Sequence, residues 1–483
     1  MRVSYDWLKT MIDIPEDPKT LSDEYIRTGT EVEAIDTVGE SFDHVVTAKV
    51  LTKTPHPDSD HMYVCSVDVG DKNLDADGNP APLQIVCGAQ NFEAGDHIVT
   101  AMIGAVLPGD VKIKKSKLRG VVSMGMNCSA RELGLGGDHS GIMILPEDTP
   151  CGMPFAEYVG SSDTVLDCEI TPNRPDCLSM IGMARETGAI FDSEFHVELP
   201  AIKAETGRAT DEGLCDRYVV RIVRNVKVGP SPDWMVKRLN ALGVRPHNNI
   251  VDITNYVMML TGQPLHAFDL DTFAERDGHR RVVVRAAQQD EKFTTLDGEE
   301  RVLDAGMGLI TDGERPVALA GVMGGMDSEI EDDTVDVMVE SACFNAGRTS
   351  HTSRDLSLIS DASIRFERQV DETGCVDVAN VTCALIEEIA GGEVAPGYVD
   401  VFPAPKTIDS IRLRLARVHA ICGADIEPDF IERSLTRLGC TVERDGEDFM
   451  VTPPSFRPDL PREIDLIEEV LRLWGMGRVT ATI

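Results

Sequence analysis

The sequence predicts a multidomain α+β protein that contains a small closed β-barrel between segments of mixed helix and strand. The chain has 483 residues, which at about 150 residues per domain suggests three domains. Hydrophobic residues make up 42% of it, enough for several buried cores. The pattern changes from helical to short alternating strands near residue 45 and returns to a strand and a helix near residue 165.

The N-terminal segment, residues 1–38, predicts two short helices, Tyr5–Met11 and Leu21–Thr28, and then a strand at Val32–Val38. Short strands separated by turn-forming Pro and Gly follow, at Val45–Thr52, Met62–Val69, Leu83–Cys87, His97–Met102 and Gly141–Leu145. In the second of these, Tyr63, Cys65, Val67 and Val69 share one face. Period-two strands of this length are typical of a small closed barrel.

A strand at Val165–Ile170 and a helix at Leu178–Ile190 follow the barrel, and the polar stretch 192–212 is typical of a linker. A long α+β block runs from about 213 to 395. A connector with Pro and Gly, 391–410, leads to a last strand–helix unit. No internal repeat or low-complexity segment interrupts this organisation.

The chain is strongly acidic, since 46 Lys and Arg against 82 Asp and Glu give a net charge of −36. Such a balance argues against nucleic-acid binding, although a local basic patch can still bind phosphate because charges are screened beyond about 8 Å. We expect a cytoplasmic protein without a membrane segment, because no run of 18 apolar residues and no signal peptide occurs. Twelve cysteines scattered without a C-x-x-C pair favour a reducing compartment.

One dense group of cations lies inside the predicted barrel, and we call it the basic cluster: Lys112, Lys114, Lys115, Lys117 and Arg119. Small five-stranded barrels bind oligonucleotides on a strand face and its loops. The cluster therefore predicts contact with phosphates, and a solvated loop is the alternative.

Two other motifs leave alternatives open. The segment His56–His61 with Cys65 offers ligand types suited to zinc, but its spacing fits no standard zinc motif, and a loop before a strand explains it equally well. The glycine-rich stretch 320–325 lacks the features of a phosphate-binding loop, so it predicts either a bend where backbone meets a ligand or a plain tight turn. No motif of a catalytic nucleophile is found.

The last helix is predicted to begin near Pro461, which suits a first-turn position, with Asp459 upstream as its cap. Two apolar stripes follow, Ile464, Ile467, Leu471 and Trp474 on one side and Leu466, Val470 and Leu473 on the other. The polar strip between them holds Asp465, Glu468, Glu469 and Arg472. Its three carboxylates can converge on Mg²⁺, and a solvated acidic face is the alternative.

Longer motifs are spread along the chain. The most distinctive runs from Ser231 to Val257, with G-V-R-P-H-N-N-I-V-D-I-T-N-Y at 243–256, and continues as G-Q-P-L-H-A-F-D at 262–269. Others are G-T-E-V-E (29–33), V-C-G-A (86–89), T-P-N-R-P-D-C-L (171–178), D-A-S-I-R-F-E-R (361–368) and P-S-F-R-P-D (454–459). Together they closely resemble the beta-subunit family of bacterial-type phenylalanine–tRNA ligases. Family members continue into a synthetase-like, catalytically silent domain and an anticodon-reading domain, which this sequence lacks.

The resemblance implies a hetero-oligomer of two alpha and two beta subunits that attaches phenylalanine to tRNA(Phe), with the ATP-dependent site on the alpha subunit. It implies an OB-type tRNA-binding β-barrel (39–150) inserted in an N-terminal α+β domain (1–38 and 151–195), an α+β editing domain of the B3/B4 type (213–390) and a small C-terminal α+β B5 domain (405–480). The editing domain would hydrolyse tyrosine wrongly attached to the tRNA. The basic cluster falls inside the tRNA-binding barrel.

The same resemblance assigns site residues. His266, Glu340 and Ser360 are the expected catalytic residues of the editing pocket, and Arg245, Gly321, Gly324 and Ala362 the expected substrate-binding ones. Glu340 would accept a hydrogen bond from the tyrosine hydroxyl, while His266 and Ser360 would orient the ester and a water molecule. Ser360 stands where many bacterial members carry threonine, which leaves the fit of the pocket open.

Family members also bind Mg²⁺, shared with the alpha subunit, through four carboxylates. These match Asp459, Asp465, Glu468 and Glu469, which we call the carboxylate quartet. The alternative to a proofreading subunit is a non-enzymatic tRNA-binding or regulatory module whose pocket has decayed.

Overall fold

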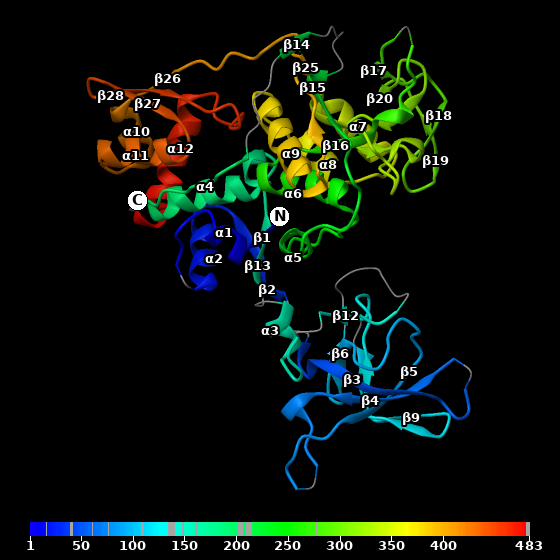
Figure 1. Ribbon diagram of the computed structural model, residues 1–483. Coiled ribbons are helices and arrows are strands. Elements are labelled where there is room, and N and C mark those ends of the chain that lie inside the picture. Colours follow the sequence, from blue (N-terminus) through cyan, green and yellow to red (C-terminus); the bar gives the residue numbers. More distant parts are fainter. Residues whose placement is uncertain are drawn as a thin grey trace. The chain divides into compact units, whose positions relative to one another are not determined.

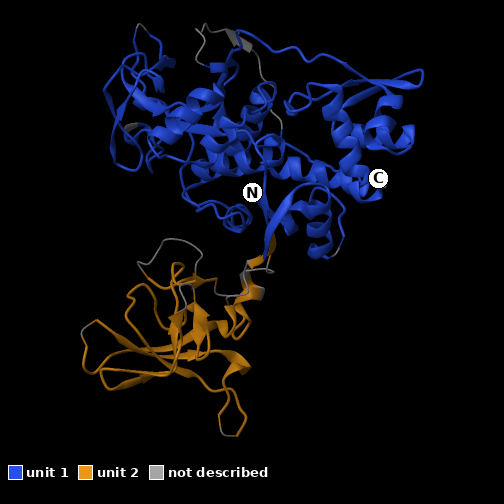
Figure 2. Cartoon of the chain, turned by 180° about the vertical axis from the view of Figure 1, so that it is seen from behind, with its two compact units in different colours: residues 1–35, 166–483 blue, residues 36–165 orange. Residues whose placement is uncertain are grey.

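The computed structural model describes most of the chain, and its residues fall into two compact units (Figures 1 and 2). The described residues are 1–15, 17–38, 42–59, 61–75, 77–107, 111–133, 141–146, 149–159, 163–200, 206–208, 215–276 and 278–479. The first unit combines residues 1–35 with 166–483. The second contains residues 36–165, within which the predicted insertion 39–150 lies. Among the described residues, no helix is long and apolar enough to cross a membrane.

The N-terminal part of the first unit is a three-stranded sheet with three helices. The sheet has the order β1 (Arg2–Ser4), β13 (Asp163–Glu169), β2 (Glu31–Val38), and the helices are α1 (Tyr5–Lys9), α2 (Pro18–Arg27) and α4 (Met180–Phe191). These elements confirm the predicted ones. Helix α2 begins three residues earlier than predicted because Asp17 caps it, accepting a hydrogen bond from Lys19 N at 3.0 Å, and Pro18 suits its first turn.

The second unit holds a nearly closed barrel, as the alternating pattern predicts. Its strands follow the order β11 (Gly125–Asn127), β6 (His97–Met102), β3 (Val45–Pro55), β4 (Tyr63–Asp68), β5 (Leu83–Cys87), with β12 (Ile144–Leu145) beside β6. Two hydrogen bonds draw the ends together, from Met124 N to Gln84 O at 2.8 Å and from Val86 N to Ser123 Oγ at 3.0 Å. Cys65, Val67 and Val69 are buried as predicted. The strand predicted at Gly141–Leu145 is shorter, and α3 (Phe155–Val159) follows the barrel.

Two small hairpins and the three residues between them hold the basic cluster. The hairpins are β7 (Val106–Leu107) with β8 (Val111–Lys112), and β9 (Ser116–Leu118) with β10 (Val121–Ser123). Sequence periodicity gave no sign of strands as short as these.

The block after residue 213 consists of two sheets and helices. The main sheet has the order β14 (Thr206–Arg208), β25 (Tyr398–Val401), β15 (Cys215–Arg224), β23 (Val337–Phe344), β16 (Leu265–Asp269), with β24 (Glu393–Val394) beside β15. The second sheet is β17 (Val283–Ala286), β20 (Gly308–Thr311), β21 (Pro316–Leu319), β22 (Met323–Gly324), and β18 (Glu291–Thr294) pairs with β19 (Glu300–Leu303). The helices are α5 (Asp233–Ala241), α6 (Asn249–Thr261), α7 (Ala346–Asp355), α8 (Asp361–Glu367) and α9 (Cys375–Ala390).

Strand β23 is buried on both faces, and its alternation separates two cores. Val337 and Val339 pack into the core that includes α6 and α9. Met338, Ala342 and Phe344 face the opposite way, into the core shared with β20 and β21. Glu340 lies on that second face, between the two sheets.

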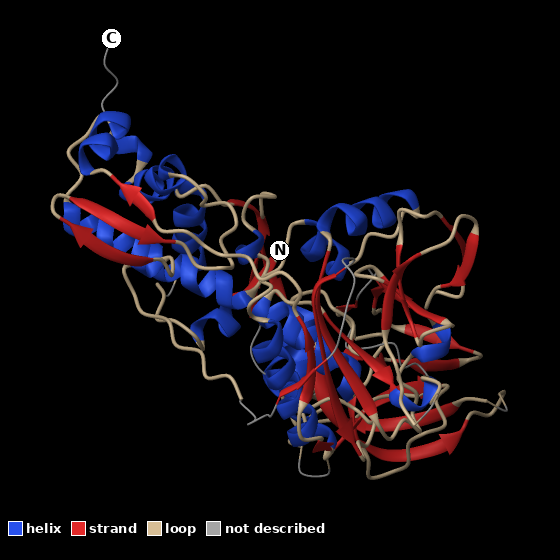
Figure 3. Cartoon of the chain, turned by 90° about the horizontal axis from the view of Figure 1, so that it is seen from above, coloured by secondary structure: helices blue, strands red, loops and turns tan. Residues whose placement is uncertain are grey.

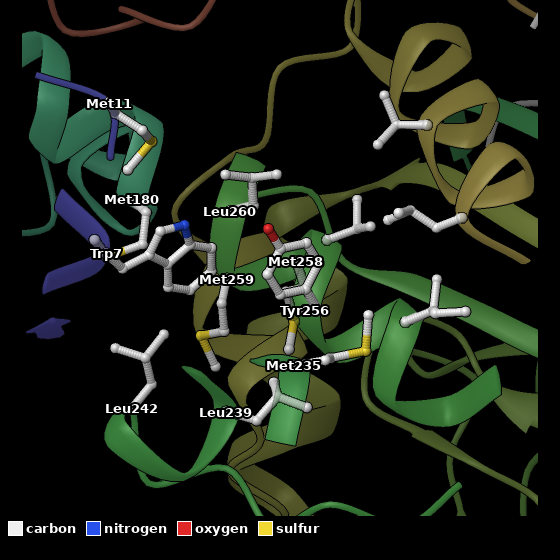
Figure 4. Packing of buried hydrophobic residues seen from close by; sticks show 14 of the residues in the cluster. Trp7, Met11, Met180, Met235, Leu239, Leu242, Tyr256, Met258, Met259 and Leu260 are labelled. Carbon is white, nitrogen blue, oxygen red and sulfur yellow. The ribbon is translucent and has the colours of Figure 1, made fainter. Parts of the chain in front are cut away.

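The largest core joins this block to the N-terminal part of the first unit. Trp7 of α1 stacks on Tyr256 of α6 with ring centroids 5.0 Å apart. Methionine and leucine side chains from α4, α5 and α6 surround this pair, among them Met180, Leu239 and Met259 (Figure 4). The predicted editing block therefore shares its core with the N-terminal domain.

The last part of the first unit is a three-stranded sheet with three helices (Figure 3). The sheet has the order β26 (Ile411–Leu413), β28 (Asp448–Thr452), β27 (Thr441–Asp445), and the helices are α10 (Leu415–Cys422), α11 (Pro428–Arg437) and α12 (Glu463–Trp474). The strand–helix unit predicted here is thus larger than expected.

The predicted cap of α12 is wrong. The helix is capped at Arg462, whose backbone N donates to Asp465 at 2.9 Å, and Asp459 instead accepts hydrogen bonds from Arg457. The polar strip, for which a solvated acidic face was one alternative, contains two buried residues, since Glu469 is 5% and Arg472 6% exposed. They are buried because charged partners from other segments meet them there.

Candidate functional site

The candidate site lies between the two sheets of the 213–400 block. Glu340 of β23 and His266 of β16 are direct partners across two antiparallel strands, so their side chains share one face of the main sheet. They line a cavity of about 60 Å³. Its remaining wall is apolar or glycine and consists of Pro264, Leu265, Ile310, Ala318, Leu319, Gly321, Val322, Met323, Gly324, Phe344, Ala362 and Phe366.

Glu340 is a buried carboxylate with one hydrogen-bond donor. The hydroxyl of Tyr218 donates to its Oε2, and among the described residues no arginine or lysine forms an ion pair with it. Burial raises the pKa of Glu340 to about 7, opposed by the hydrogen bond from Tyr218. An acceptor held this way in an apolar pocket favours a ligand that brings its own hydroxyl.

His266 offers an unused nitrogen beside this carboxylate. Its Nε2 is buried and has no hydrogen-bond partner among the described residues. Burial lowers the pKa of His266 to about 4, so the imidazole is neutral at pH 7 and can accept a proton from a bound group. A buried ring nitrogen of this kind is available to a ligand or to a water molecule in the cavity.

The glycines of the 320–325 stretch make room for the pocket. A Cβ atom at Gly324 would lie 2.9 Å from Cε1 of His266. Gly321 has φ +72°, and a Cβ there would lie 3.1 Å from the rings of Phe344 and Phe366. The sequence left open whether the stretch 320–325 is a bend at a ligand or a plain tight turn. In the structure this stretch bends and forms part of the pocket wall.

The cavity wall does not include two of the expected residues. The Ser360 hydroxyl accepts from Ser363 N at 3.0 Å and donates to Val322 O at 2.9 Å, so it caps α8 and ties that helix to the glycine stretch. Arg245 is exposed in the connection between α5 and α6. The structure brings together His266, Gly321, Gly324, Glu340 and Ala362, while catalysis by Ser360 and tRNA binding by Arg245 stay predictions.

Sequence reasoning missed three aromatic residues of the site, Tyr218, Phe344 and Phe366. Tyr218 is 122 residues away from its partner Glu340 in the sequence. Alternation in a strand indicates which face Tyr218 occupies, but only the sheet order places it beside Glu340.

The basic cluster is exposed on the barrel unit, with every cation on the surface. A groove of about 890 Å³ runs beside it, and its walls include Lys112, Lys114 and Arg131 together with the V-C-G-A motif at 86–89. Lys115, Lys117 and Arg119 lie outside the groove wall, and Arg119 donates to the backbone oxygen of Asp58 at 2.9 Å. The groove therefore gives part of the cluster a concave surface with a positive edge.

The zinc alternative for the 56–65 segment gains no support. His56 is buried, with its Nε2 3.1 Å from Leu118 O and its Nδ1 accepting from Asp58 N at 3.0 Å. Asp60 lies outside the described residues. Among the described ones, the groupings with metal-ligand geometry are elsewhere, at Asp216, Cys343 and Glu372 and at Asp304, His351 and Asp355.

The carboxylate quartet is neutralised by arginines. Asp459 accepts from Arg457 at 2.8 and 2.9 Å, and Asp465 accepts from Arg462 at 2.8 and 3.0 Å. Glu469 accepts from Arg472 at 2.9 Å, and Glu468 is exposed. Because three of these four carboxylates are paired with guanidinium groups, the quartet in this arrangement does not fit Mg²⁺.

Glu469 belongs to a larger group of buried charges, which we call the buried ion cluster: Arg174, Asp176, Glu186, Arg457, Asp459, Glu469 and Arg472. Arg472 of α12 donates to Glu186 of α4, and Glu186 also accepts from Arg174 at 2.8 Å. Burial alone would raise the pKa of Glu186, but Arg174 and Arg472 outweigh it and hold the pKa below its usual range. The cluster joins the N-terminal part of the unit to its last part.

Three family models match the chain: "Putative tRNA binding domain" over residues 45–154, "B3/4 domain" over 214–391 and "tRNA synthetase B5 domain" over 411–476. Curated relatives include phenylalanine–tRNA ligase beta subunits of Syntrophotalea carbinolica and Geobacter sulfurreducens, each 44% identical over 100% of this chain, and of Salinibacter ruber, 42% identical over 99%. The matches cover 60%, 60% and 59% of these relatives, so the chain spans about three fifths of their length.

A solved N-terminal fragment of the phenylalanyl-tRNA synthetase beta subunit from Pyrococcus horikoshii is also similar. It matches with a TM-score of 0.36 at 17% identity, over 65% of this chain and 87% of that one, a likeness too low to bear on the fold.

Proposed function

This chain belongs to the family of phenylalanine–tRNA ligase beta subunits, and from that premise we propose that it binds tRNA(Phe) and hydrolyses tyrosine wrongly attached to it. Its partner would be the alpha subunit, in an assembly of two subunits of each kind in the cytoplasm. The alpha subunit would carry the ATP-dependent attachment of phenylalanine. The basic cluster and the neighbouring groove of the barrel would contact tRNA phosphates.

The observation that carries the proofreading proposal is the pocket itself: a buried carboxylate and an unpartnered neutral imidazole in an apolar cavity. Phenylalanine and tyrosine differ by one para-hydroxyl. Glu340 accepts the hydrogen bond of that hydroxyl, whereas phenylalanine would leave the carboxylate desolvated without it. A site that hydrogen-bonds a substrate hydroxyl rejects the analogue lacking it by about 10⁴-fold or more.

Hydrolysis needs no covalent nucleophile on the protein. A water molecule adds to the ester carbon, the acyl C–O bond breaks, and the tRNA hydroxyl leaves with a proton. His266 is neutral, and its Nε2 has no partner among the described residues, so it accepts a proton from that water and returns it to the leaving oxygen of the tRNA. Ser360 contributes by fixing α8, which carries Ala362, against the glycine stretch.

The cavity has a volume of about 60 Å³. The small residues Gly324 and Ala362 in its wall leave space for the ring of the substrate.

Mg²⁺ would bind the carboxylate quartet only by displacing the arginines paired with Asp459, Asp465 and Glu469. A non-enzymatic tRNA-binding or regulatory module remains the second candidate. The intact acceptor and imidazole of the pocket favour the enzyme.

The test is to incubate the chain, alone and with the alpha subunit, with Tyr-tRNA(Phe) and Phe-tRNA(Phe). We expect loss of tyrosine and sparing of phenylalanine. Glu340→Ala should abolish this selectivity, His266→Ala should slow hydrolysis, and Ala362→Trp should block entry. Parental clearance of Tyr-tRNA(Phe) by Glu340→Ala, with Phe-tRNA(Phe) still spared, would contradict the assignment of the pocket.

A further inference from the structure

We propose that Tyr218 determines the specificity of the proofreading pocket by positioning Glu340, an inference that rests on the proposed function. The Tyr218 hydroxyl donates to Oε2 of Glu340. The other carboxylate oxygen is then left for the hydroxyl of the substrate. One carboxylate thus accepts two phenolic hydroxyls, one from the protein and one from the misattached tyrosine.

The position of Tyr218 is fixed by the main sheet and by its packing. Val220 of β15 lies opposite Glu340, and Tyr218 lies opposite Ala342, so Tyr218 is the diagonal neighbour of Glu340 on the same face. Its ring is buried and meets the ring of Phe344 edge-on, with centroids 6.2 Å apart. A ring held in this way can aim its hydroxyl at a single carboxylate oxygen.

Among the described residues, no cation forms an ion pair with Glu340. The titratable groups near Glu340 are Tyr218 and Cys215 on β15 and His266 on β16. Burial raises the pKa of Tyr218 and of Cys215 well above their usual ranges and lowers that of His266, so all three are neutral at pH 7. The second sheet and α8 present only apolar side chains and glycine to the cavity.

The hydroxyl of Tyr218 is therefore what favours the ionised, accepting form of Glu340 against the cost of burial. Without it, Glu340 would hold a proton at neutral pH. A protonated carboxyl group can donate as well as accept, so it discriminates less sharply between a ligand with a hydroxyl and one without.

Tyr218→Phe tests this, because it keeps the ring and removes only the hydroxyl. We expect KM for hydrolysis of Tyr-tRNA(Phe) to rise about 10- to 100-fold at pH 7, as for loss of a hydrogen bond to a charged group, with kcat changed much less. Raising the pH should restore KM, because Glu340 then ionises. Tyr256→Phe is the matched control, since that buried hydroxyl bonds Arg238 at 2.9 Å away from the cavity, and it should leave KM unchanged.

A second readout does not depend on catalysis. The titration of the Glu340 carboxyl, followed by infrared difference spectroscopy with Glu340→Gln to identify its band, should move to higher pH in Tyr218→Phe. An unchanged midpoint, or parental KM at every pH in Tyr218→Phe, would overturn the inference. If the parent chain hydrolyses neither ester, the proposed function fails. The titration of Glu340 in Tyr218→Phe then still tests whether the Tyr218 hydroxyl favours the ionised carboxylate.

Discussion

Replacing Arg472 by leucine should loosen the attachment of α12 to the N-terminal part of the first unit. Arg472 is 6% exposed and donates to both Glu186 and Glu469, at 2.9 Å for the Nε contact with Glu469. After the substitution Glu186 keeps only Arg174, and Glu469 keeps only Arg457, at 2.8 and 3.2 Å. Each carboxylate stays buried but keeps only one of its two arginine partners.

The expected cost follows from this loss. Removing one partner of a buried ion pair costs about 3–5 kcal/mol, because it leaves an uncompensated buried charge. At 1.4 kcal/mol per factor of ten, α12 should detach from about 100-fold to about 4,000-fold more often. The stabilising effect also depends on pH. Since the folded-state pKa of Glu186 lies below its usual value of 4.5, its contribution is complete above about pH 4.5 and is lost as the pH falls below that value.

Hydrogen exchange of the α12 amides measures the effect directly, because it reports local opening as well as global unfolding. The matched control is Arg462→Leu. Arg462 also pairs with an acid three residues later, Asp465, but its side chain is 72% exposed, and exposed pairs contribute less than about 1 kcal/mol. Equal protection of α12 in Arg472→Leu and the parent, or equal losses in both variants, would refute the reasoning.

Three further predictions concern the pocket, the barrel and the metal. Glu340→Gln should remove a pH dependence of stability: the folded-state pKa is raised to about 7, so the contribution of Glu340 to stability is greatest below pH 4.5 and falls by roughly 3 kcal/mol as the pH rises to 7, which urea unfolding at pH 5 and pH 8 would detect. Replacing Lys114 and Lys115 by alanine should weaken tRNA binding and flatten its dependence on salt without changing which tRNA is preferred, and an unchanged slope in filter binding would count against the basic cluster. The carboxylate quartet should bind Mg²⁺ weakly or not at all in this chain alone, because arginines occupy three of its members, and tight stoichiometric binding in calorimetry would show otherwise.

Local patterns predicted much of the fold. Alternating residues such as Cys65 and Val67 marked the barrel strands, because one face of each strand is buried. Strands of two or three residues, such as β8 and β9, carry too few residues to show a period, so the hairpins of the basic cluster were not predicted.

Long-range contacts explain the remaining differences. Helical spacing placed Glu469 and Arg472 between two apolar stripes, but it held no sign that Glu186 of α4 would meet them. The motif match assigned Ser360 to catalysis, which stays a prediction, and the structure adds that Ser360 forms a capping box with Ser363. His266 and Glu340 came from the family motifs, while Tyr218 needed the strand order of the main sheet.

The insertion of the barrel unit also imposes an order on folding. Cys168 N donates to Met1 O at 2.9 Å, although these residues are 167 positions apart, so β1 and β2 have no sheet partner until β13 has been synthesised. The barrel strands β3 to β12 lie within the contiguous stretch 45–145 and can fold on the ribosome before that point. Once folded, the barrel shortens the loop that must close, which lowers the entropy cost of pairing β1 with β13. The inserted barrel thus helps the surrounding sheet to assemble.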